Sequence, residues 1–364
     1  MIPIAEPSLG EEELRNVVEA VKTNWISSKG KFISEFEKSF ANYCDVKYGI
    51  ATSNGTTALH LALAALGIRS GNEVLVPSLT FISTANVVGF CGATPVFVDS
   101  HPDYWCMDPS KLEENITEKT KAIMPVHLYG HPCDMDPILE IAKKHDLSVV
   151  EDAAEAHGSE YKGEKIGGFG DVSCFSFYGN KVITTGEGGM CITNNEELAE
   201  KMRILRDHGE DPARKYMHQT IGFNYRMTNL QAAVGVAQVK KLEKFVDKKR
   251  EIAKWYGDSL RPLSEKGLIK LHPEMPWAKS VYWMYSILVE DGFPGTRDKL
   301  MKKLEENGIE TRPFFPPIQK QPPYLSSTEK TPVADELSAR GINLPSFTNL
   351  SKENIEFIAS AIKK

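Results

Sequence analysis

Lys181 lies in a glycine-rich segment that could hold an amine close to an electrophile. The segment runs from Phe175 to Gly189 with the sequence FSFYGNKVITTGEGG, and it overlaps the apolar run Val172 to Phe177. Such a run predicts a buried strand, so the lysine would project just beyond the end of a rigid element. This placement suits a Schiff-base amine, although most lysines in proteins are solvated surface charges.

A second segment could bind a phosphate. It runs from Thr52 to Leu63 with the sequence TSNGTTALHLAL, in which a glycine and two threonines precede a helical run. Free N–H groups at a helix start favour an anion, and Gly55 would let a phosphate approach the backbone while Thr56 and Thr57 could add hydroxyl donors. The alternative is an ordinary helix N-cap, which small polar residues form frequently.

A third segment places carboxylates directly after an apolar strand. It runs from Val149 to Gly158 with the sequence VVEDAAEAHG. Ligands of open α/β sheets gather at the carboxyl ends of strands, so Asp152 stands where a ligand would bind. A carboxylate there could keep a pyridine nitrogen protonated, and the alternative is a helix cap. His157 has no second ligand at metal spacing, so no metal site is predicted.

The three segments together match the needs of one cofactor. Pyridoxal 5′-phosphate (PLP) requires a contact for its phosphate, a partner for its ring nitrogen and an amine for its aldehyde. Each signal is modest when taken alone. Their combination predicts a PLP site built from Lys181, Asp152 and the cup at Gly55 to Thr57.

Composition excludes several other classes of protein. Among 364 residues, 41% are hydrophobic and 25% are charged, which is ordinary for a soluble globular protein. The formal net charge of −6 argues against a nucleic-acid partner recognised mainly through its phosphates. The six cysteines form no CxxC pair, and no apolar run is long enough to span a membrane. Without a signal sequence at the start of the chain, a cytoplasmic protein is expected.

Short apolar runs alternate with helical segments over about residues 50 to 195, which predicts a mainly parallel sheet with helices on both faces. The predicted strands are Glu73–Pro77, Pro95–Asp99, Lys121–His127, Leu147–Asp152, Val172–Phe177 and Met190–Thr193.

Helix signals follow between and after the predicted strands. Pro137, after Asp136, is expected at the first position of one helix, and Thr228 to Gln231 has the spacing of a capping box. A long charged helix is expected from Lys240 to Leu260. The character of the sequence changes after about residue 245, which predicts a large domain over residues 1–245 and a smaller one over residues 246–364.

The chain also resembles the DegT/StrS family of sugar aminotransferases over nearly its whole length. The resemblance implies a fold-type-I PLP-dependent transferase like aspartate aminotransferase, with a mainly parallel seven-stranded sheet and a smaller C-terminal α+β domain. It further implies a homodimer with shared active sites. The matching motifs are Asn54–Ala62, Glu73–Phe81, Pro125–Gly130, Glu151–Gly158, Ser176–Lys181, Gly186–Gly189 and Gly222–Gln231.

The resemblance assigns roles around the cofactor. Lys181 would be the Schiff-base lysine, Asp152 the partner of the pyridine nitrogen and Glu155 a contact to the ring hydroxyl. Phe81 would stack on the ring. At the phosphate, the cup would be completed by Ser176 of the same subunit and Asn224 of the other subunit. Some relatives carry histidine in place of the lysine and act as dehydratases, so lysine favours transamination.

The resemblance also places the nucleotide sugar. The expected substrate-binding residues are Trp25, Ser27, Arg312 and Tyr324. Within the family the match is best to members that aminate C4 of GDP-4-keto-6-deoxymannose to give GDP-perosamine, with L-glutamate as donor, for O-antigen lipopolysaccharide synthesis. The alternatives are the same reaction on a dTDP- or UDP-linked 4-keto-6-deoxy sugar and, more distantly, a non-catalytic regulatory protein of the same fold.

Overall fold

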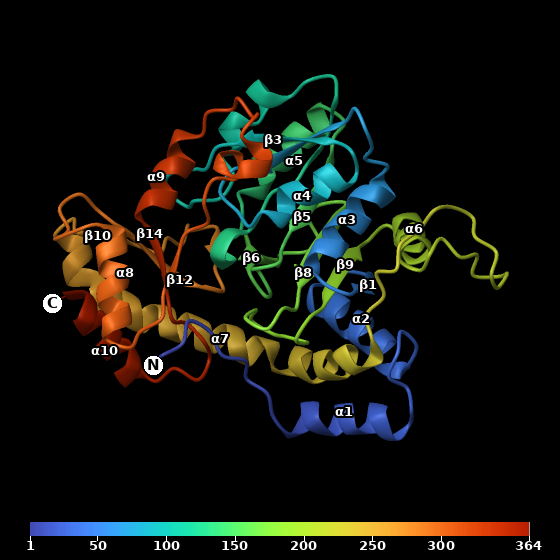
Figure 1. The fold of residues 1–364 in the computed structure, drawn as a ribbon, viewed down its shortest axis with the longest axis horizontal. Coiled ribbons are helices and arrows are strands. Elements are labelled where there is room, and N and C mark those ends of the chain that lie inside the picture. Colours follow the sequence, from blue (N-terminus) through green and yellow to red (C-terminus); the bar gives the residue numbers. More distant parts are fainter. Residues whose placement is uncertain (364) are drawn as a thin grey trace.

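A seven-stranded sheet lies at the centre of the computed structural model, which describes residues 1–363 (Figure 1). The strand order is β1-β9-β8-β5-β4-β2-β3. β9 is antiparallel to both of its neighbours, whereas the other adjacent strands pair in parallel. The strands are β1 (Tyr48–Thr52), β2 (Glu73–Pro77), β3 (Thr94–Val98), β4 (Thr120–Ile123), β5 (Ser148–Asp152), β8 (Val172–Ser176) and β9 (Gly189–Thr193). The predicted α/β fold with a mainly parallel seven-stranded sheet is confirmed.

Two strands of this sheet differ from the sequence-based prediction by more than one residue at an end. β1 was not among the predicted runs, because Tyr48–Thr52 mixes glycine, alanine and threonine with one large aliphatic residue. β4 ends at Ile123, four residues before the predicted end. Pro125 has no N–H to donate to a ladder, so the regular pairing does not continue through it.

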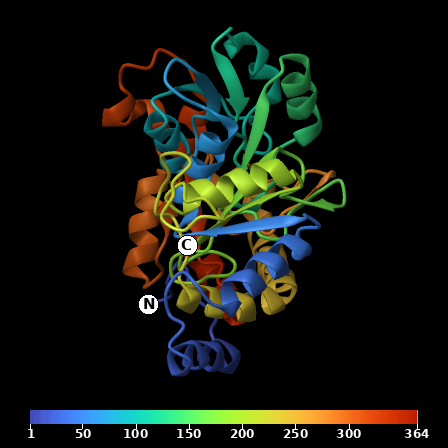
Figure 2. The same ribbon diagram turned by 90° about the vertical axis from the view of Figure 1, so that its right-hand side faces the viewer.

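Helices enclose the sheet (Figure 2). α3 packs on β5, β8 and β9, α4 on β2 and β3, and α5 on β4 and β5, while α2 packs on β1 and α7. Figure 2 shows α1 at one extremity of the molecule. These helices are α1 (Glu11–Lys22), α2 (Lys31–Tyr43), α3 (Gly55–Leu66), α4 (Ser83–Phe90), α5 (Met135–Lys144) and α6 (Glu196–Arg206).

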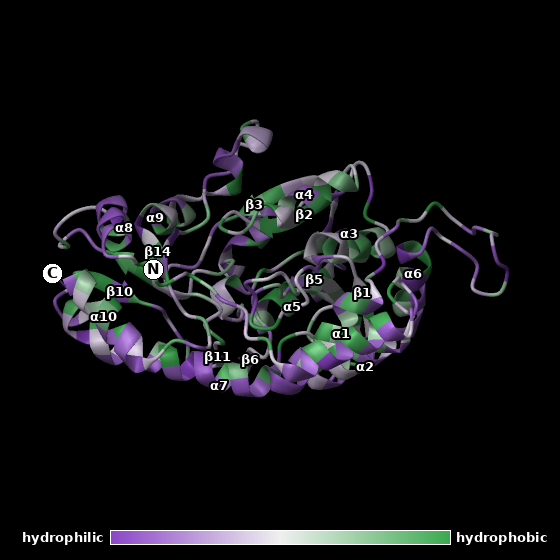
Figure 3. Cartoon of the chain, turned by 60° about the horizontal axis from the view of Figure 1, so that its bottom comes forward, coloured by the Kyte–Doolittle hydropathy of each residue, from purple (hydrophilic) through white to green (hydrophobic). Residues whose placement is uncertain are grey.

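α7 (Asn229–Glu265) is a single helix of 37 residues. Its start confirms the predicted capping box, since Thr228 accepts the N–H of Gln231 and the Gln231 side chain accepts the N–H of Thr228. The predicted limits of Lys240 and Leu260 were too narrow. Figure 3 shows hydrophilic and hydrophobic residues alternating along α7. The expected division after residue 245 falls inside this helix and stays a prediction.

The predicted start of α5 was wrong by two residues. The helix begins at Met135, so Pro137 occupies its third position instead of its first. The N–H groups of a first turn have no partner within the helix, so proline is tolerated anywhere in it.

The C-terminal part of the chain forms a four-stranded antiparallel sheet with the order β10-β12-β14-β13. Its strands and helices are β10 (Ile269–Leu271), β12 (Tyr285–Val289), α8 (Arg297–Glu306), β13 (Arg312–Pro313), α9 (Pro332–Arg340), β14 (Gly341–Leu344) and α10 (Lys352–Lys363). Short 3-10 helices are η1 (Pro109–Lys111), η2 (Glu113–Asn115), η3 (Leu128–Gly130), η4 (Ile318–Lys320) and η5 (Pro322–Tyr324). Among the helices of residues 1–363, none has the length and apolar character needed to cross a membrane.

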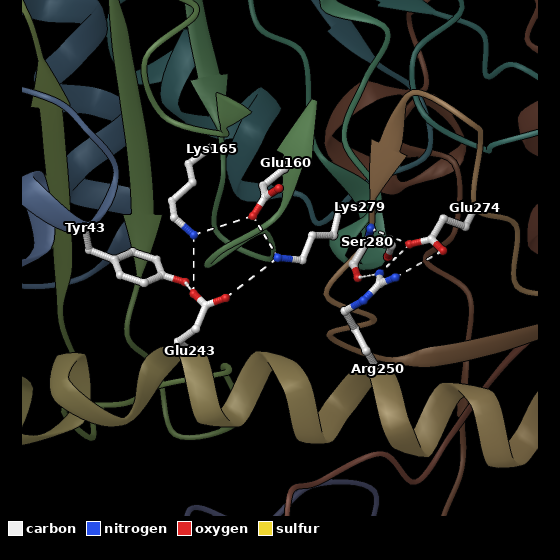
Figure 4. Close-up of polar contacts among 8 residues, drawn as sticks. All are labelled: Tyr43, Glu160, Lys165, Glu243, Arg250, Glu274, Lys279 and Ser280. Carbon is white, nitrogen blue, oxygen red and sulfur yellow. Dashed lines mark hydrogen bonds and ion pairs between the residues drawn. The ribbon is translucent and has the colours of Figure 1, made fainter. Parts of the chain in front are cut away.

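A polar network attaches the middle of α7 to a small sheet (Figure 4). This sheet has the order β11-β6-β7 and contains β6 (Glu160–Tyr161), β7 (Glu164–Lys165) and β11 (Ala278–Lys279). Glu160 pairs with Lys279 at 2.8 Å and with Lys165 at 3.6 Å, and Lys165 also pairs with Glu243 of α7 at 3.3 Å. Because β11 belongs to the C-terminal part, the network ties this part to both α7 and the central region.

Candidate active site

Lys181 lies in the turn that follows β8, as the apolar run predicted. Its backbone N–H donates to the carbonyl of Tyr178 at 2.9 Å, and its side chain is 11% exposed. The amine Nζ is 4.0 Å from Oε1 of Glu155 and 3.9 Å from the centroid of the Trp283 ring. Burial lowers the pKa of the Lys181 amine below its ordinary value. The amine is therefore more readily neutral, and hence nucleophilic, than a surface lysine.

Asp152 ends β5, the strand next to β8. Its Oδ2 accepts the hydroxyl of Thr84 at 2.8 Å, and its Oδ1 accepts the N–H of Ala154 at 3.2 Å. The carboxyl is buried, which raises its pKa. A buried carboxylate gains from a cationic partner, and a protonated pyridine nitrogen would be one.

Glu155 completes a buried group of charges with Asp152 and Lys181. Its Oε2 accepts the backbone N–H of Tyr129 at 2.7 Å. Burial raises the pKa of its carboxyl to about 7. Burial thus shifts both members of the Glu155 and Lys181 pair toward their neutral forms, and because the two groups lie 4.0 Å apart the protonation of each depends on the other.

The predicted phosphate cup is the first turn of α3. The cap alternative holds for Thr57: its N–H donates to Oδ1 of Asn54 at 2.9 Å, and its hydroxyl bonds back to the Asn54 backbone. The hydroxyl of Thr56 lies 2.9 Å from that of Ser83. The start of α3 therefore offers backbone N–H groups at Gly55 and Thr56, while the side chain of Thr57 serves the capping box.

Gly55 lies against Ser176 at the end of β8. A Cβ added to Gly55 would be 2.8 Å from Cβ of Ser176, so only glycine allows this approach. The cup is thus brought beside the strand that leads to Lys181. Residues suited to a phosphate, a ring nitrogen and an aldehyde converge at the ends of β5 and β8 and the start of α3, and this arrangement fits PLP.

The remaining predicted residues lie further out. Phe81 is exposed, and its ring centroid is 5.9 Å from that of Phe315. Arg312 is exposed on β13, close enough for its charge to disfavour the protonated form of Lys181. The hydroxyl of Tyr324 donates to Oδ1 of Asn86 at 2.8 Å, which holds η5 against α4.

Trp25 and Ser27 belong to the segment between α1 and α2. Their backbone carbonyls accept the side-chain N–H and the backbone N–H of Asn229 at the start of α7, each at 2.6 Å. The Trp25 side chain is exposed. Asn224 lies in the loop between α6 and α7, where its Oδ1 accepts N–H groups of Arg226. Figure 1 shows that part of this loop extends away from the molecule. Asn224 itself forms a β-bridge with Asp207, directly after α6.

Three residues in the Lys181 group were not predicted as site residues. Thr84 holds Asp152, Tyr129 holds Glu155 and Trp283 lies under Lys181. Tyr129 is in a segment that carried the family resemblance, but neither its residue type nor that of Trp283 gave a sign of contact with the site. Their approach depends on long-range packing.

Known proteins share both the sequence and the fold. A GDP-perosamine synthase of Caulobacter vibrioides is 50% identical over 362 residues, covering 99% of this chain and 97% of that protein. The GDP-perosamine synthase of Escherichia coli O157:H7 is 48% identical, covering 100% and 98%. The structure of DesV from Streptomyces venezuelae with a ketimine intermediate has a TM-score of 0.90 and 35% identity, covering 97% of this chain and 93% of DesV.

The profile of one family matches nearly the whole chain, from residue 7 to residue 363. This match agrees with the resemblance seen in the sequence motifs and with the convergence of Lys181, Asp152 and Glu155. The chain belongs to the DegT/DnrJ/EryC1/StrS aminotransferase family.

Proposed function

We propose that this protein converts GDP-4-keto-6-deoxymannose to GDP-perosamine by transferring an amino group from L-glutamate to C4. The observation that carries the proposal is the buried group of Lys181, Asp152 and Glu155 in a chain about half identical to two GDP-perosamine synthases over nearly their full lengths. Aminotransferases of the family depend on PLP. When bound, PLP withdraws electrons from the carbon that bears the nitrogen, so that a proton can leave that carbon and return to it.

Lys181 would supply both the covalent attachment and the proton transfer. Its amine would hold PLP through the cofactor's aldehyde and would be free to act as a base while the amino donor occupies that position. The free Nζ then removes a proton from Cα of glutamate, and in the second half of the reaction it delivers a proton to C4 of the sugar. The lowered pKa of this amine suits both roles, since a base must be neutral at the working pH before it can accept a proton.

Asp152 and Glu155 would orient the cofactor ring. Asp152, positioned by Thr84 and Ala154, would pair with a protonated ring nitrogen and keep it charged. Glu155, positioned by the N–H of Tyr129, would meet the ring hydroxyl. Phe81 would cover the ring, and the N–H groups at Gly55 and Thr56 would meet the phosphate together with the Ser176 hydroxyl, while Thr57 would support the cup through the capping box.

The nucleotide sugar would bind at the exposed side of the site. Arg312 carries a planar guanidinium that can pair with a diphosphate through two parallel hydrogen bonds. Trp25 offers an exposed aromatic surface, and Ser27 and Tyr324 offer hydroxyls. We assign these four residues to the substrate.

A homodimer with shared active sites is part of the proposal. The loop between α6 and α7 exposes large apolar side chains, with Ile221 at 92% and Tyr216 at 79% exposure. α1 also exposes a stripe formed by Leu14, Val18 and Val21. Apolar surface of this kind is typical of residues that a partner subunit covers. In such a dimer, Asn224 would reach the phosphate in the site of the other subunit.

The nucleotide can be tested directly. The protein is given PLP, L-glutamate and, in separate reactions, GDP-, dTDP- and UDP-linked 4-keto-6-deoxyhexoses. Formation of 2-oxoglutarate should be fastest with the GDP sugar and absent for Lys181→Ala. A clear preference for the dTDP or UDP sugar would contradict the GDP assignment, and cofactor binding without transfer to any sugar would contradict enzymatic function.

A further inference from the structure

Trp283 is the large side chain that lies directly against the reactive amine. The Lys181 Nζ is 3.9 Å from the centroid of the indole ring, closer than the Glu155 carboxylate at 4.0 Å from the same atom. Trp283 is 5% exposed and belongs to the segment between β11 and β12, far from Lys181 in sequence. Neither the family motifs nor the proposed roles above give this residue a function.

Three hydrogen bonds determine where the indole lies. Its ring N–H donates at 2.8 Å to the carbonyl of Asn180, the residue before Lys181. The backbone carbonyl of Trp283 accepts the hydroxyl of Ser346 at 3.2 Å. The N–H of Val281 donates to the carbonyl of Gly130 at 3.1 Å. The ring is therefore tied to the turn that carries Lys181, and the backbone before Trp283 is tied to Gly130, the neighbour of Tyr129.

Tyr129 and Gly130 also contact Trp283. The Tyr129 ring stacks with the indole at a centroid distance of 6.4 Å and an interplanar angle of 20°, and the Tyr129 N–H donates to Glu155. Gly130 has a φ of +96°, and a Cβ on it would be 2.8 Å from the backbone nitrogen of Trp283. This close approach fixes the indole relative to both Glu155 and Lys181.

The chemistry of the contact favours a charged amine. The face of an indole ring is electron-rich and attracts an ammonium group, and the attraction grows when water is excluded. Lys181 must hold a proton for part of the reaction, yet burial opposes its charged form. The indole opposes this effect without adding an acid that would trap the proton.

We propose that Trp283 is a catalytic residue whose indole face stabilises the protonated Lys181 amine and holds that amine in place. The inference rests on the proposed role of Lys181. If Trp283 has this role, the C-terminal part of the chain both covers the site and helps to set the basicity of the Lys181 amine.

The test compares Trp283→Phe with Trp283→Leu. Both variants lose the hydrogen bond to Asn180, and both stay apolar, but only phenylalanine keeps an aromatic face. Trp255→Leu is the matched control, because Lys248 Nζ lies 4.1 Å over that ring at a separate position on α7. Thermal melts and circular dichroism establish that each variant is folded. If the leucine variant does not fold, Trp283→Met replaces it.

Each apoprotein is mixed with PLP over a range of pH and quenched with borohydride, and labelling of the Lys181 peptide is measured by mass spectrometry. The ionisation of free PLP is the same in every reaction. A difference between variants in the pH at which labelling is half-maximal therefore comes from the protein. The leucine variant should capture PLP with a midpoint lower than that of the phenylalanine variant by about half a pH unit or more, because its neutral amine persists to lower pH. Trp255→Leu should match the wild type.

Two failures are distinguishable. Labelling of a lysine other than Lys181 would overturn the proposed site as a whole. Labelling of Lys181 with equal midpoints in the phenylalanine and leucine variants, or with a higher midpoint for leucine, would overturn the role of Trp283 alone.

Discussion

At the scale of single residues, burial accounts for the reactivity of the site. Asp152, Glu155 and Lys181 are all withdrawn from water, and each has a pKa shifted in the direction that burial imposes. Hydrogen bonds from Thr84 and from the Tyr129 backbone give the two carboxyls their orientation. A group of this kind binds a polar, charged cofactor well because its own charges are poorly solvated.

Asp152→Asn tests the carboxylate at the ring nitrogen. Asparagine keeps the shape but cannot hold the ring nitrogen protonated, so amino transfer from glutamate should fall by about 10²-fold or more while PLP remains attached to Lys181. Single-turnover kinetics followed by absorbance would measure this. Thr84→Val removes only the hydroxyl donor to Asp152, so its rate of amino transfer should fall by less than that of Asp152→Asn. An Asp152→Asn variant within a few-fold of the wild type would exclude this role.

Lys249 is a second buried lysine, on α7, and it affects stability. Its Nζ donates to the carbonyl of Ser346, and burial lowers its pKa to about 7. The unfolded chain has an ordinary lysine pKa of about 10.4, so between about pH 7 and 10 the unfolded state binds more protons at this site. The stability of the wild type should therefore rise with pH across this window relative to Lys249→Met.

Denaturant unfolding at several pH values would measure this difference. The exposed neighbour Lys254→Met is the control and should track the wild type. An equal pH dependence in the wild type and Lys249→Met would show that Lys249 is charged in the folded protein.

At the scale of elements, the site depends on where strands end and where loops approach them. β5 and β8 are parallel neighbours, so Asp152 and the turn with Lys181 share one edge of the sheet. The start of α3 reaches the same edge because Gly55 lies against Ser176. The segment before β12 then covers the group with Trp283.

Gly130→Ala tests this covering segment. Alanine at a φ of +96° is strained by about 1 kcal/mol, and its Cβ would also meet Trp283 and Val281 at 2.8 Å. Gly163→Ala is the matched control, with a φ of +86° and open space around it. Gly130→Ala should be less stable than the control by a further ~1–3 kcal/mol in denaturant unfolding. Equal losses would mean that the contact with Trp283 is unimportant.

Sequence patterns predicted the strands that are apolar throughout, and they missed a strand that mixes small, polar and apolar residues. Strands buried on both faces read as apolar runs, and the capping box at Thr228 marked the start of α7. β1 was not predicted because most of its residues are small or polar. Lys181 and Asp152 could be predicted because each follows a strand. Trp283 and Tyr129 could not, because only tertiary packing brings them to the site.

At the scale of the whole molecule, the proposed function calls for a second subunit to complete the site. The loop between α6 and α7 extends away from the molecule (Figure 1). It exposes the apolar side chains of Tyr216 and Ile221. The polar network of Figure 4 ties α7 to the C-terminal part, so the half of the site that carries Trp283 is held by the same chain. The proposed dimer would add the remaining phosphate contact.

Mixing two inactive variants tests the shared site. Asn224→Asp places a carboxylate against the partner's phosphate and should inactivate, as should Lys181→Ala. A hybrid dimer has one site with both residues intact, so random mixing during refolding should restore about a quarter of wild-type activity. Activity no greater than that of the separate variants would argue against shared sites.

The most direct measurement of the central claim follows the amino nitrogen itself. Isotopically labelled L-glutamate is incubated with GDP-4-keto-6-deoxymannose, PLP and the protein, and the position of the label in the product is determined by nuclear magnetic resonance. The proposed function predicts the label on C4 of a GDP-linked sugar, with one 2-oxoglutarate formed for each amine transferred, and none with Lys181→Ala. Label at another carbon, or amination that persists in Lys181→Ala, would contradict it.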